Sequence, residues 1–175
     1  RRALETAQRG GVRRVEARAR ISLGSLCEQD GRPAEARPFV EAGLAFYRTA
    51  GYRRESIQAA VVLGGVLQQL GQHEEGIRIL RDTLPIAMTL QDTRLEAQLR
   101  ERLADSLRDS GQWPAAVDEY DRSVALYGSL PAANLLRTQA VRLQWHMGRE
   151  EPAARFLTEA HSRPANPGNS EFRAL

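Results

Sequence analysis

The side chains of this 175-residue chain that could carry out chemistry are three histidines and a single cysteine. His73 is followed by two glutamates, but no second histidine stands four residues on, so the helical zinc-protease motif is incomplete. His146 and His161 belong to other helical regions, and we predict solvated or capping roles for all three histidines and no metal site. Cys27 lies on an apolar helix face, which indicates a buried thiol and not a nucleophile.

The sequence contains 25 arginines and no lysine. Without lysine, neither a Walker-type phosphate loop nor a Schiff-base catalyst can be built. No nucleophile, base and orienting group can be assembled from the other motifs, so we predict a protein that is not an enzyme and needs no cofactor. The net charge of +3 is small for 175 residues and argues against nucleic acid as a partner.

Two groups of side chains could instead recognise a partner. Glu101, Asp105 and Asp109 recur every four residues and share one helix face, which either lines an acidic groove or is simply solvated. Trp145 stands close to Arg142 in the sequence, and Trp and Arg dominate the energetics of many interfaces. Trp145 is therefore the best single candidate for a partner anchor.

A motif that returns every 40 residues organises the chain. Leu23, Leu63 and Leu103 lie 40 residues apart, and each is followed by glycine or alanine. Turn glycines keep this step, with a shorter step of 37 to a divergent fourth copy: Gly31, Gly71, Gly111 and Gly148. Self-similarity at a fixed period of roughly 20 to 50 residues is typical of a solenoid.

Apolar residues at intervals of three and four predict two amphipathic helices in each copy, joined by a glycine turn. The expected units are 12–49, 53–91, 93–127 and 131–161. Leu4 and Gly11 lie 40 residues before Leu44 and Gly51, so residues 1–9 are expected to be the end of a second helix from a preceding repeat. In the first helix, from 12 to 30, one apolar stripe is predicted to be buried: Val15, Ala19, Leu23, Leu26 and Cys27.

Length and composition fit one helical domain, expected at 1–161, followed by a flexible tail at 162–175 that is rich in Pro, Asn, Gly and Ser. No apolar run approaches the ~20 residues that cross a bilayer, and no secretory segment follows the first residues. A single cysteine cannot form an intramolecular disulfide, which fits a reducing compartment, and we expect a cytoplasmic protein. The chain is expected to be a piece of a longer protein.

The repeated pattern resembles the tetratricopeptide repeat family. The resemblance rests on the Leu-Gly pairs, on the glycine turn, and on the small residue that opens each second helix. It also rests on an apolar or aromatic residue four positions after that small residue: Val40, Leu80, Tyr120 and Leu157. The step of 40 exceeds the family's usual length of roughly 34 and is similar to the long repeats of bacterial regulators of the maltose-activator type and of kinesin light chains.

The resemblance implies an all-α fold, a right-handed α-α superhelix with three full repeats, one divergent C-terminal repeat and a leading half repeat. It also implies that first helices line the inside of the curve. The residues that it places on this concave groove are Arg18, Ser25, Gln29, Gln58, Gly65, Gln68, Gln98, Glu101, Asp105, Arg108, Arg142, Trp145 and His146. The carboxylate clamp of chaperone-binding members is not expected, because lysine is absent and no asparagine stands at the matching positions.

Two functions follow as expectations. The first is a non-catalytic module of a larger signalling or regulatory protein, which binds a protein or peptide segment in the groove; the rest of its own chain is a further expected partner. The second is a sensor domain of a bacterial transcription regulator, which takes a small ligand in the same concavity. A small-ligand site needs apolar walls, and the predicted groove is mostly polar, which favours the first.

Overall fold

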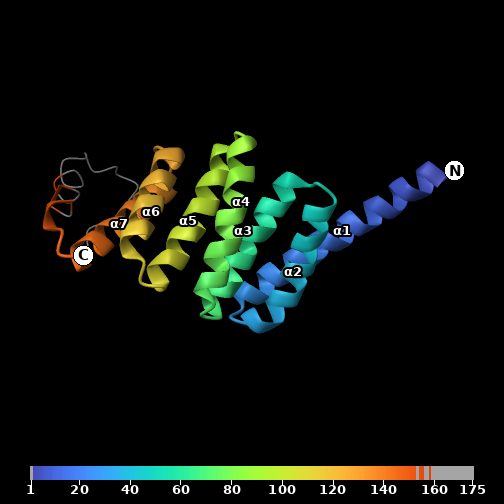
Figure 1. Ribbon diagram of the computed structural model, residues 1–175, viewed down its shortest axis with the longest axis horizontal. Coiled ribbons are helices and arrows are strands. Elements are labelled where there is room, and N and C mark those ends of the chain that lie inside the picture. Colours follow the sequence, from blue (N-terminus) through green and yellow to red (C-terminus); the bar gives the residue numbers. More distant parts are fainter. Residues whose placement is uncertain (1, 153, 156–157, 159–175) are drawn as a thin grey trace, which may run out of the picture.

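The computed structural model describes residues 2–152, 154, 155 and 158, with side chains from residue 11 onward (Figure 1). No strand is assigned in this part of the chain, and residues 150–152, 154, 155 and 158 are helical. Seven helices with defined bounds precede them. They are α1 (Arg2–Gln29), α2 (Pro33–Thr49), α3 (Arg53–Gln69), α4 (His73–Thr89), α5 (Thr93–Asp109), α6 (Trp113–Tyr127) and α7 (Pro131–His146). The predicted tail at 162–175 lies outside the described residues.

Left-handed residues produce the turns between successive helices. Gly31, Gly51 and Gly71 have φ angles of 71° to 75°, a region that glycine enters without a steric penalty. Each of these three turns is also closed by a backbone hydrogen bond of the Schellman type, such as Arg32 N–H to the Cys27 carbonyl at 2.8 Å. Because α2, α3, α4 and α5 each have 17 residues, the turns fall 20 residues apart and antiparallel hairpins stack side by side (Figure 1).

The hairpins form an all-helical superhelical solenoid, which confirms the predicted fold class. Helix α7 begins at Pro131, as the sequence indicated, since proline is favoured in a first helical turn. The N-terminal end differs from the prediction, because residues 2 to 29 form one continuous helix and Gly11 makes no turn. In the described part of the chain no element packs across Gly11 to stabilise a turn, and a glycine inside a helix costs only about 1 kcal/mol.

The buried side of α1 also differs from the prediction. Of the five stripe residues predicted to be buried, only Cys27 is; Val15, Ala19, Leu23 and Leu26 are exposed. The side that faces α2 is formed instead by small residues. A Cβ added at Gly24 would lie 2.3 Å from Cγ2 of Val40, and one added at Gly43 would lie 2.6 Å from Cδ1 of Ile21. Helices α1 and α2 therefore pack closely through glycines, and the predicted stripe points the other way.

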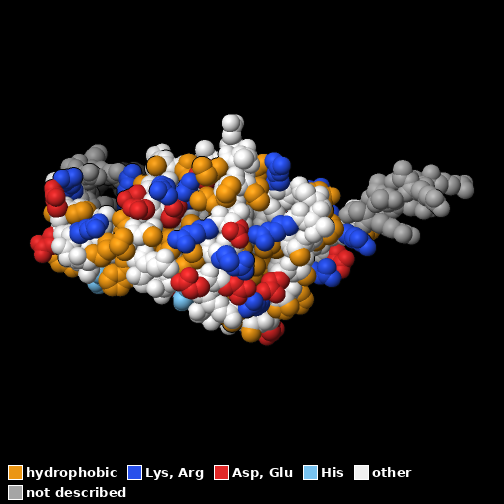
Figure 2. All heavy atoms as spheres, viewed as in Figure 1, with side chains coloured by type: hydrophobic (Ala, Val, Ile, Leu, Met, Phe, Trp, Pro, Cys, Tyr) orange, Lys and Arg blue, Asp and Glu red, His pale blue; other side chains and the backbone are white. Residues whose placement is uncertain are grey.

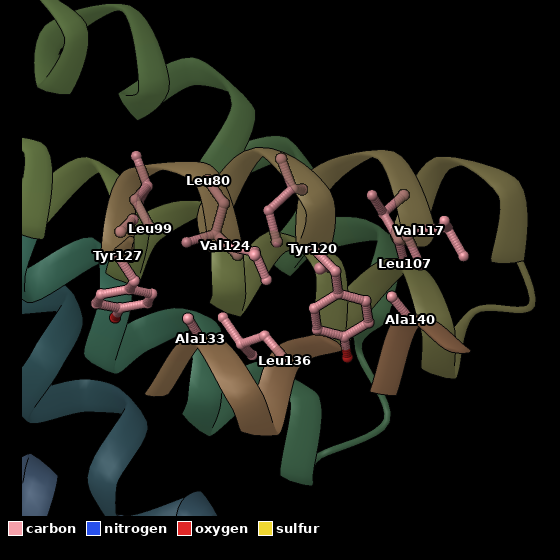
Figure 3. Close-up of a cluster of buried hydrophobic side chains, with 14 of the residues drawn as sticks. Leu80, Leu99, Leu107, Val117, Tyr120, Val124, Tyr127, Ala133, Leu136 and Ala140 are labelled. Atoms are coloured by element: carbon pink, nitrogen blue, oxygen red, sulfur yellow. The ribbon is translucent and has the colours of Figure 1, made fainter. Parts of the chain in front are cut away.

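Two apolar clusters form the core along the solenoid. One joins α1, α2 and α3 and includes Ile79 of α4, and the other extends from α3 through α7. In the second cluster, Tyr120 is fully buried and lies between Leu136 and Ala140 of α7 (Figure 3). The hydroxyl groups of Tyr120 and Tyr127 point to the same side, away from the aliphatic side chains (Figure 3). These two hydroxyls connect the core to the polar surface described below.

Candidate functional site

The first helices of successive hairpins lie next to one another. Helix α3 contacts both α1 and α5, whereas each second helix mainly contacts the first helices on either side of it. We call the shared surface of α1, α3 and α5, on the side where Glu28, Gly65 and Arg102 meet, the first-helix face. Ten of the thirteen predicted groove residues belong to these three helices: Arg18, Ser25, Gln29, Gln58, Gly65, Gln68, Gln98, Glu101, Asp105 and Arg108.

Gly65 forms a notch at the middle of this face. A Cβ added there would lie 2.0 Å from Oε1 of Glu28 and 3.4 Å from Cζ of Arg102, so side chains from the two neighbouring repeats meet above α3. Burial raises the pKa of the Glu28 carboxyl above its ordinary value, and the positive charge of Arg102 only partly opposes the increase. The notch thus holds an acidic and a basic group from different repeats in a partly desolvated position.

A second link joins α3 to α5 at the end of the face. The Gln68 amide donates to Oδ2 of Asp109 at 2.6 Å, and Arg108 Nε donates to Oδ1 of Asp109 at 2.7 Å. Burial alone would raise the pKa of the Asp109 carboxyl, but the hydrogen bonds from Arg108 and Gln68, together with the positive charge of Arg108, lower it. Asp109 therefore stays ionised and orients two of the predicted groove residues.

The acidic row on α5 is tied to the core tyrosines of α6. The Tyr120 hydroxyl donates to Oδ1 of Asp105 at 2.6 Å, and the Tyr127 hydroxyl donates to Oε2 of Glu101 at 3.0 Å. Burial, together with the facing carboxylates, raises the pKa of both phenols. Burial also raises the pKa of Glu101, and the hydrogen bond from Tyr127 only partly opposes this. Glu101 and Asp105 therefore belong to the first-helix face and are also held in position by hydrogen bonds from α6.

The remaining predicted residues of the three helices have freer side chains. Arg18, Gln29 and Gln58 are exposed, while Ser25 and Gln98 are partly buried. Gln58 and Gln98 occupy the same position of successive repeats, 40 residues apart. An amide side chain both donates and accepts hydrogen bonds, so such a pair can bind the backbone of an extended peptide.

The three predicted residues on α7 are not part of the first-helix face. Helix α7 packs against α6 rather than against α5, so Arg142, Trp145 and His146 are not joined to the row on α1, α3 and α5. Trp145 is 57% exposed, and the His146 ring lies 6.3 Å from the Trp113 ring, measured between centroids. These residues form a separate aromatic and basic surface at the C-terminal end.

Sequence reasoning missed the roles of Glu28 and Arg102 in bridging repeats. A signal was present, because Gly65 follows a glycine inside a helix, where a second glycine is unfavourable unless another group approaches closely. Sequence reasoning also missed a buried network, in which Arg100 donates to Oε1 of Glu96 at 2.8 Å and to Oε2 of Glu119 at 2.7 Å. This network holds α5 to α6 and is structural.

The surface chemistry of the described residues is mixed. Figure 2 shows arginines, acidic residues and apolar side chains interspersed over the face in view. Within the described part, no three His, Cys, Asp or Glu side chains gather closely enough to hold a metal ion. A search of the same residues finds no helix that is both long and apolar enough to span a bilayer.

Comparisons with known proteins agree with this architecture. The tetratricopeptide repeat family matches residues 55–129 of the chain. None of the curated proteins matches the sequence. Among solved structures, the chain is similar to a kinesin light chain with nearly identical TPR-like repeats from Podosopora anserina, at 18% identity and a TM-score of 0.74. That match covers 85% of this chain and 77% of the other chain.

Two further structures are longer than this chain. A Rap protein in complex with Competence and Sporulation Factor matches at 14% identity and a TM-score of 0.73, over 85% of this chain and 44% of the other. Aspartyl phosphate phosphatase F from Bacillus subtilis matches at 12% identity and a TM-score of 0.76, over 86% of this chain and 40% of the other. At such low identity these similarities concern the fold alone, which is that of TPR-like repeat proteins.

Proposed function

We propose that the chain is a non-catalytic module that binds a protein or peptide segment on its first-helix face, as part of a larger cytoplasmic regulatory or signalling protein. The observation that carries the proposal is the meeting of Glu28, Gly65 and Arg102, which come from the first helices of three successive hairpins. It supports one polar surface that continues from α1 across α3 to α5. Because packed helix axes lie about 8–10 Å apart, this surface extends over roughly 20 Å. That length suits several residues of an extended segment.

The composition of the face supports an extended polar segment over a compact apolar ligand. Partly buried carboxylates at Glu28 and Glu101 alternate with Arg102 and with side-chain amides. Such a surface offers hydrogen bonds to a peptide backbone and charge contacts to its side chains, without a deep apolar pocket. The solved structure of a Rap protein with Competence and Sporulation Factor supports partner binding by this fold.

A direct test uses matched variants on the two sides of the solenoid. Peptides are first selected from a random displayed library on the 175-residue chain, and the dissociation constant of the best peptide is measured by fluorescence anisotropy. Gln58→Ala with Gln98→Ala should weaken binding tenfold or more, which corresponds to about 1.4 kcal/mol. Arg78→Ala with Asp118→Ala, two exposed positions of the second helices that are also 40 residues apart, should change it less than twofold. Equal effects of the two pairs would place the binding site elsewhere.

The surface on α7 is tested separately as a partner anchor. Trp145 is exposed although tryptophan usually packs in a core, and Arg142 is exposed on the same helix. If this surface extends the binding site, Trp145→Ala with Arg142→Ala should weaken binding of the selected peptide by at least tenfold. Unchanged affinity would restrict the site to α1, α3 and α5.

The alternative, a small-ligand sensor, has one supporting feature. A hollow of about 310 Å³ lies near the turn between α2 and α3, lined by Tyr47, Arg48, Gly51, Arg53, Ser56, Asp82 and Ile86. Its volume is at the lower end for ligand sites, and its two arginines are exposed, so it offers few of the apolar walls that such sites have. A rise in melting temperature with a metabolite, in a chain that selects no peptide, would favour the sensor.

A further inference from the structure

An exposed apolar stripe runs along α1. Its members are Val12, Val15, Ala19, Leu23 and Leu26, and we call them the α1 stripe. Val12 and Val15 are each 68% exposed, Leu23 is 44% exposed and Leu26 is 56% exposed. With 3.6 residues per turn, the five side chains fall within an arc of about 80° around the helix. Such a narrow apolar band on a solvated helix indicates that another helix covers it.

The repeat register shows what kind of helix fits. In α3, the residues 40 positions after Ala19, Leu23 and Leu26 are all buried: Ala59, Leu63 and Val66. In α5, the residues 80 positions after them are also buried: Leu99, Leu103 and Ser106. Helix α2 packs against α3 and helix α4 packs against α5, and each is the second helix of the preceding hairpin. The α1 stripe therefore matches the surface that receives a second helix returning from a turn.

We propose that residues 2–9 of the chain dock on the α1 stripe in a second conformation, in which the chain turns back at Gly10–Gly11. This conformation interconverts with the one in which α1 is a single continuous helix. The sequence of this segment carries the register of a second helix. Leu4, Ala7 and Gly11 stand 40 residues before Leu44, Tyr47 and Gly51. Leu44 and Tyr47 are buried at the end of α2, and Gly51 is the left-handed turn residue with φ of 75°.

The backbone at residues 10 and 11 permits this exchange. Two consecutive glycines weaken a continuous helix at that point, and glycine adopts the left-handed turn without steric cost. A Cβ added at Gly11 meets nothing within 4 Å, so no packing requirement explains the glycine in the continuous helix. The folded-back segment of eight residues rises about 12 Å, which is enough to cover Val12, Val15 and Ala19.

Distances between paired spin labels test the proposal on the 175-residue chain. The test pair is Arg2→Cys with Arg18→Cys, in a background where Cys27→Ala removes the native thiol. The matched control is Ala42→Cys with Gln58→Cys, two exposed positions 40 residues further on, in the α2–α3 hairpin. Adjacent helices place the two backbones about 10 Å apart. A continuous helix places residues 2 and 18 about 24 Å apart.

A short distance that matches the control, alone or beside a longer one, supports the proposal, and the ratio of the two populations measures the exchange. Gly11→Ala should lower the folded-back fraction relative to the extended one by roughly tenfold, since alanine disfavours the left-handed turn and favours the helix. A single distance near 24 Å overturns the proposal. A long distance in a dimer that Leu23→Glu dissociates would instead assign the stripe to a second copy of the chain, and would also overturn it.

Discussion

Gln91 occupies a backbone position that other repeats give to glycine. Its φ is 52°, whereas Gly71 and Gly111, 20 residues to either side, have φ of 71° and 79°. A side chain in the left-handed region costs roughly 1–2 kcal/mol. Glycine avoids this cost but loses more conformational entropy on folding, so the net gain in stability is smaller than the cost removed. We therefore expect Gln91→Gly to raise the free energy of unfolding by about 0.5–1 kcal/mol in urea titrations.

Gln91→Ala is the control for this prediction. Alanine keeps the left-handed strain and removes only the side chain beyond Cβ, so it should give no gain in the free energy of unfolding. An equal gain from both substitutions would mean that the Gln91 side chain, and not the backbone, limits stability at this turn.

Glu28 should make the stability depend on pH. Burial raises its pKa in the folded state above its unfolded value, so the folded protein binds a proton more readily between the two values. The contribution of Glu28 to stability is therefore unfavourable above the raised pKa and disappears as the pH falls below the unfolded value of 4.5. Glu28→Gln should raise the free energy of unfolding at pH 7 by less than about 1 kcal/mol and leave it unchanged near pH 4.

Chemical denaturation of both proteins from pH 4 to pH 8 measures this difference. A constant difference across the range would mean that packing of the amide, and not ionisation of Glu28, is responsible. A loss of stability in the Gln variant at pH 7 would mean that the attraction to Arg102 exceeds the cost of burial.

At the scale of helices, glycines of similar sequence context have different roles. A Cβ at Gly24 would lie 2.3 Å from Cγ2 of Val40 and 3.3 Å from the carbonyl oxygen of Ala36, both in the packed α1–α2 interface. A Cβ at Gly65 would meet the carboxylate of Glu28, the free end of a flexible side chain. Gly24→Ala should lower the free energy of unfolding by about 1–3 kcal/mol, despite the better helix propensity of alanine.

Gly65→Ala is the comparison on the next first helix, one residue after the position that matches Gly24. It should leave stability unchanged or raise it by up to about 1 kcal/mol, because Glu28 can rotate into solvent. Thermal denaturation of both variants side by side gives the answer, and a loss as large as that of Gly24→Ala would show that the Glu28–Arg102 contact is needed for folding.

The helix order could be predicted from the sequence because its signals are local and repeated. Turn glycines such as Gly31 and Gly71 recur at the step of the leucines, and each copy reinforces the assignment of the others. Pro131 marked the start of α7 in the same way. The boundaries depend on backbone conformation within a few residues, and a single sequence carries that information.

The surroundings of each helix could not be predicted in this way. Leu23 and Leu63 have equivalent local sequence, yet one is exposed and the other buried, because burial depends on which helix lies on the outer side. Likewise, the sequence shows Asp105 only as one member of an acidic row, whereas in the structure it accepts a hydrogen bond from Tyr120 of the next helix. The acidic row was predicted from helical spacing, but its two tyrosine partners are 15 and 26 residues away and have no periodic signal.

At the scale of the molecule, polar links repeat between successive hairpins. They join residues 38 or 41 positions apart: Arg14 to Glu55, Arg37 to Glu75, Gln68 to Asp109 and Gln112 to Glu74. Most of these side chains are exposed or partly exposed, and such pairs contribute about 0–1 kcal/mol each. The links therefore set the register between hairpins, while the two apolar clusters supply most of the stability.

Because each hairpin contacts only its neighbours, the effect of a core substitution should depend on its place in the array. Leu103 lies in α5, between hairpins on both sides, and Leu143 lies in α7, toward the C-terminal end of the array; both are buried. Leu103→Ala should cost about 2–5 kcal/mol and increase amide exchange throughout α3 to α6. Leu143→Ala should increase exchange mainly in α7 and leave α3 and α4 protected. Hydrogen exchange measured by mass spectrometry distinguishes the two patterns, and uniform loss of protection from Leu143→Ala would mean that the solenoid unfolds as one cooperative unit and not repeat by repeat.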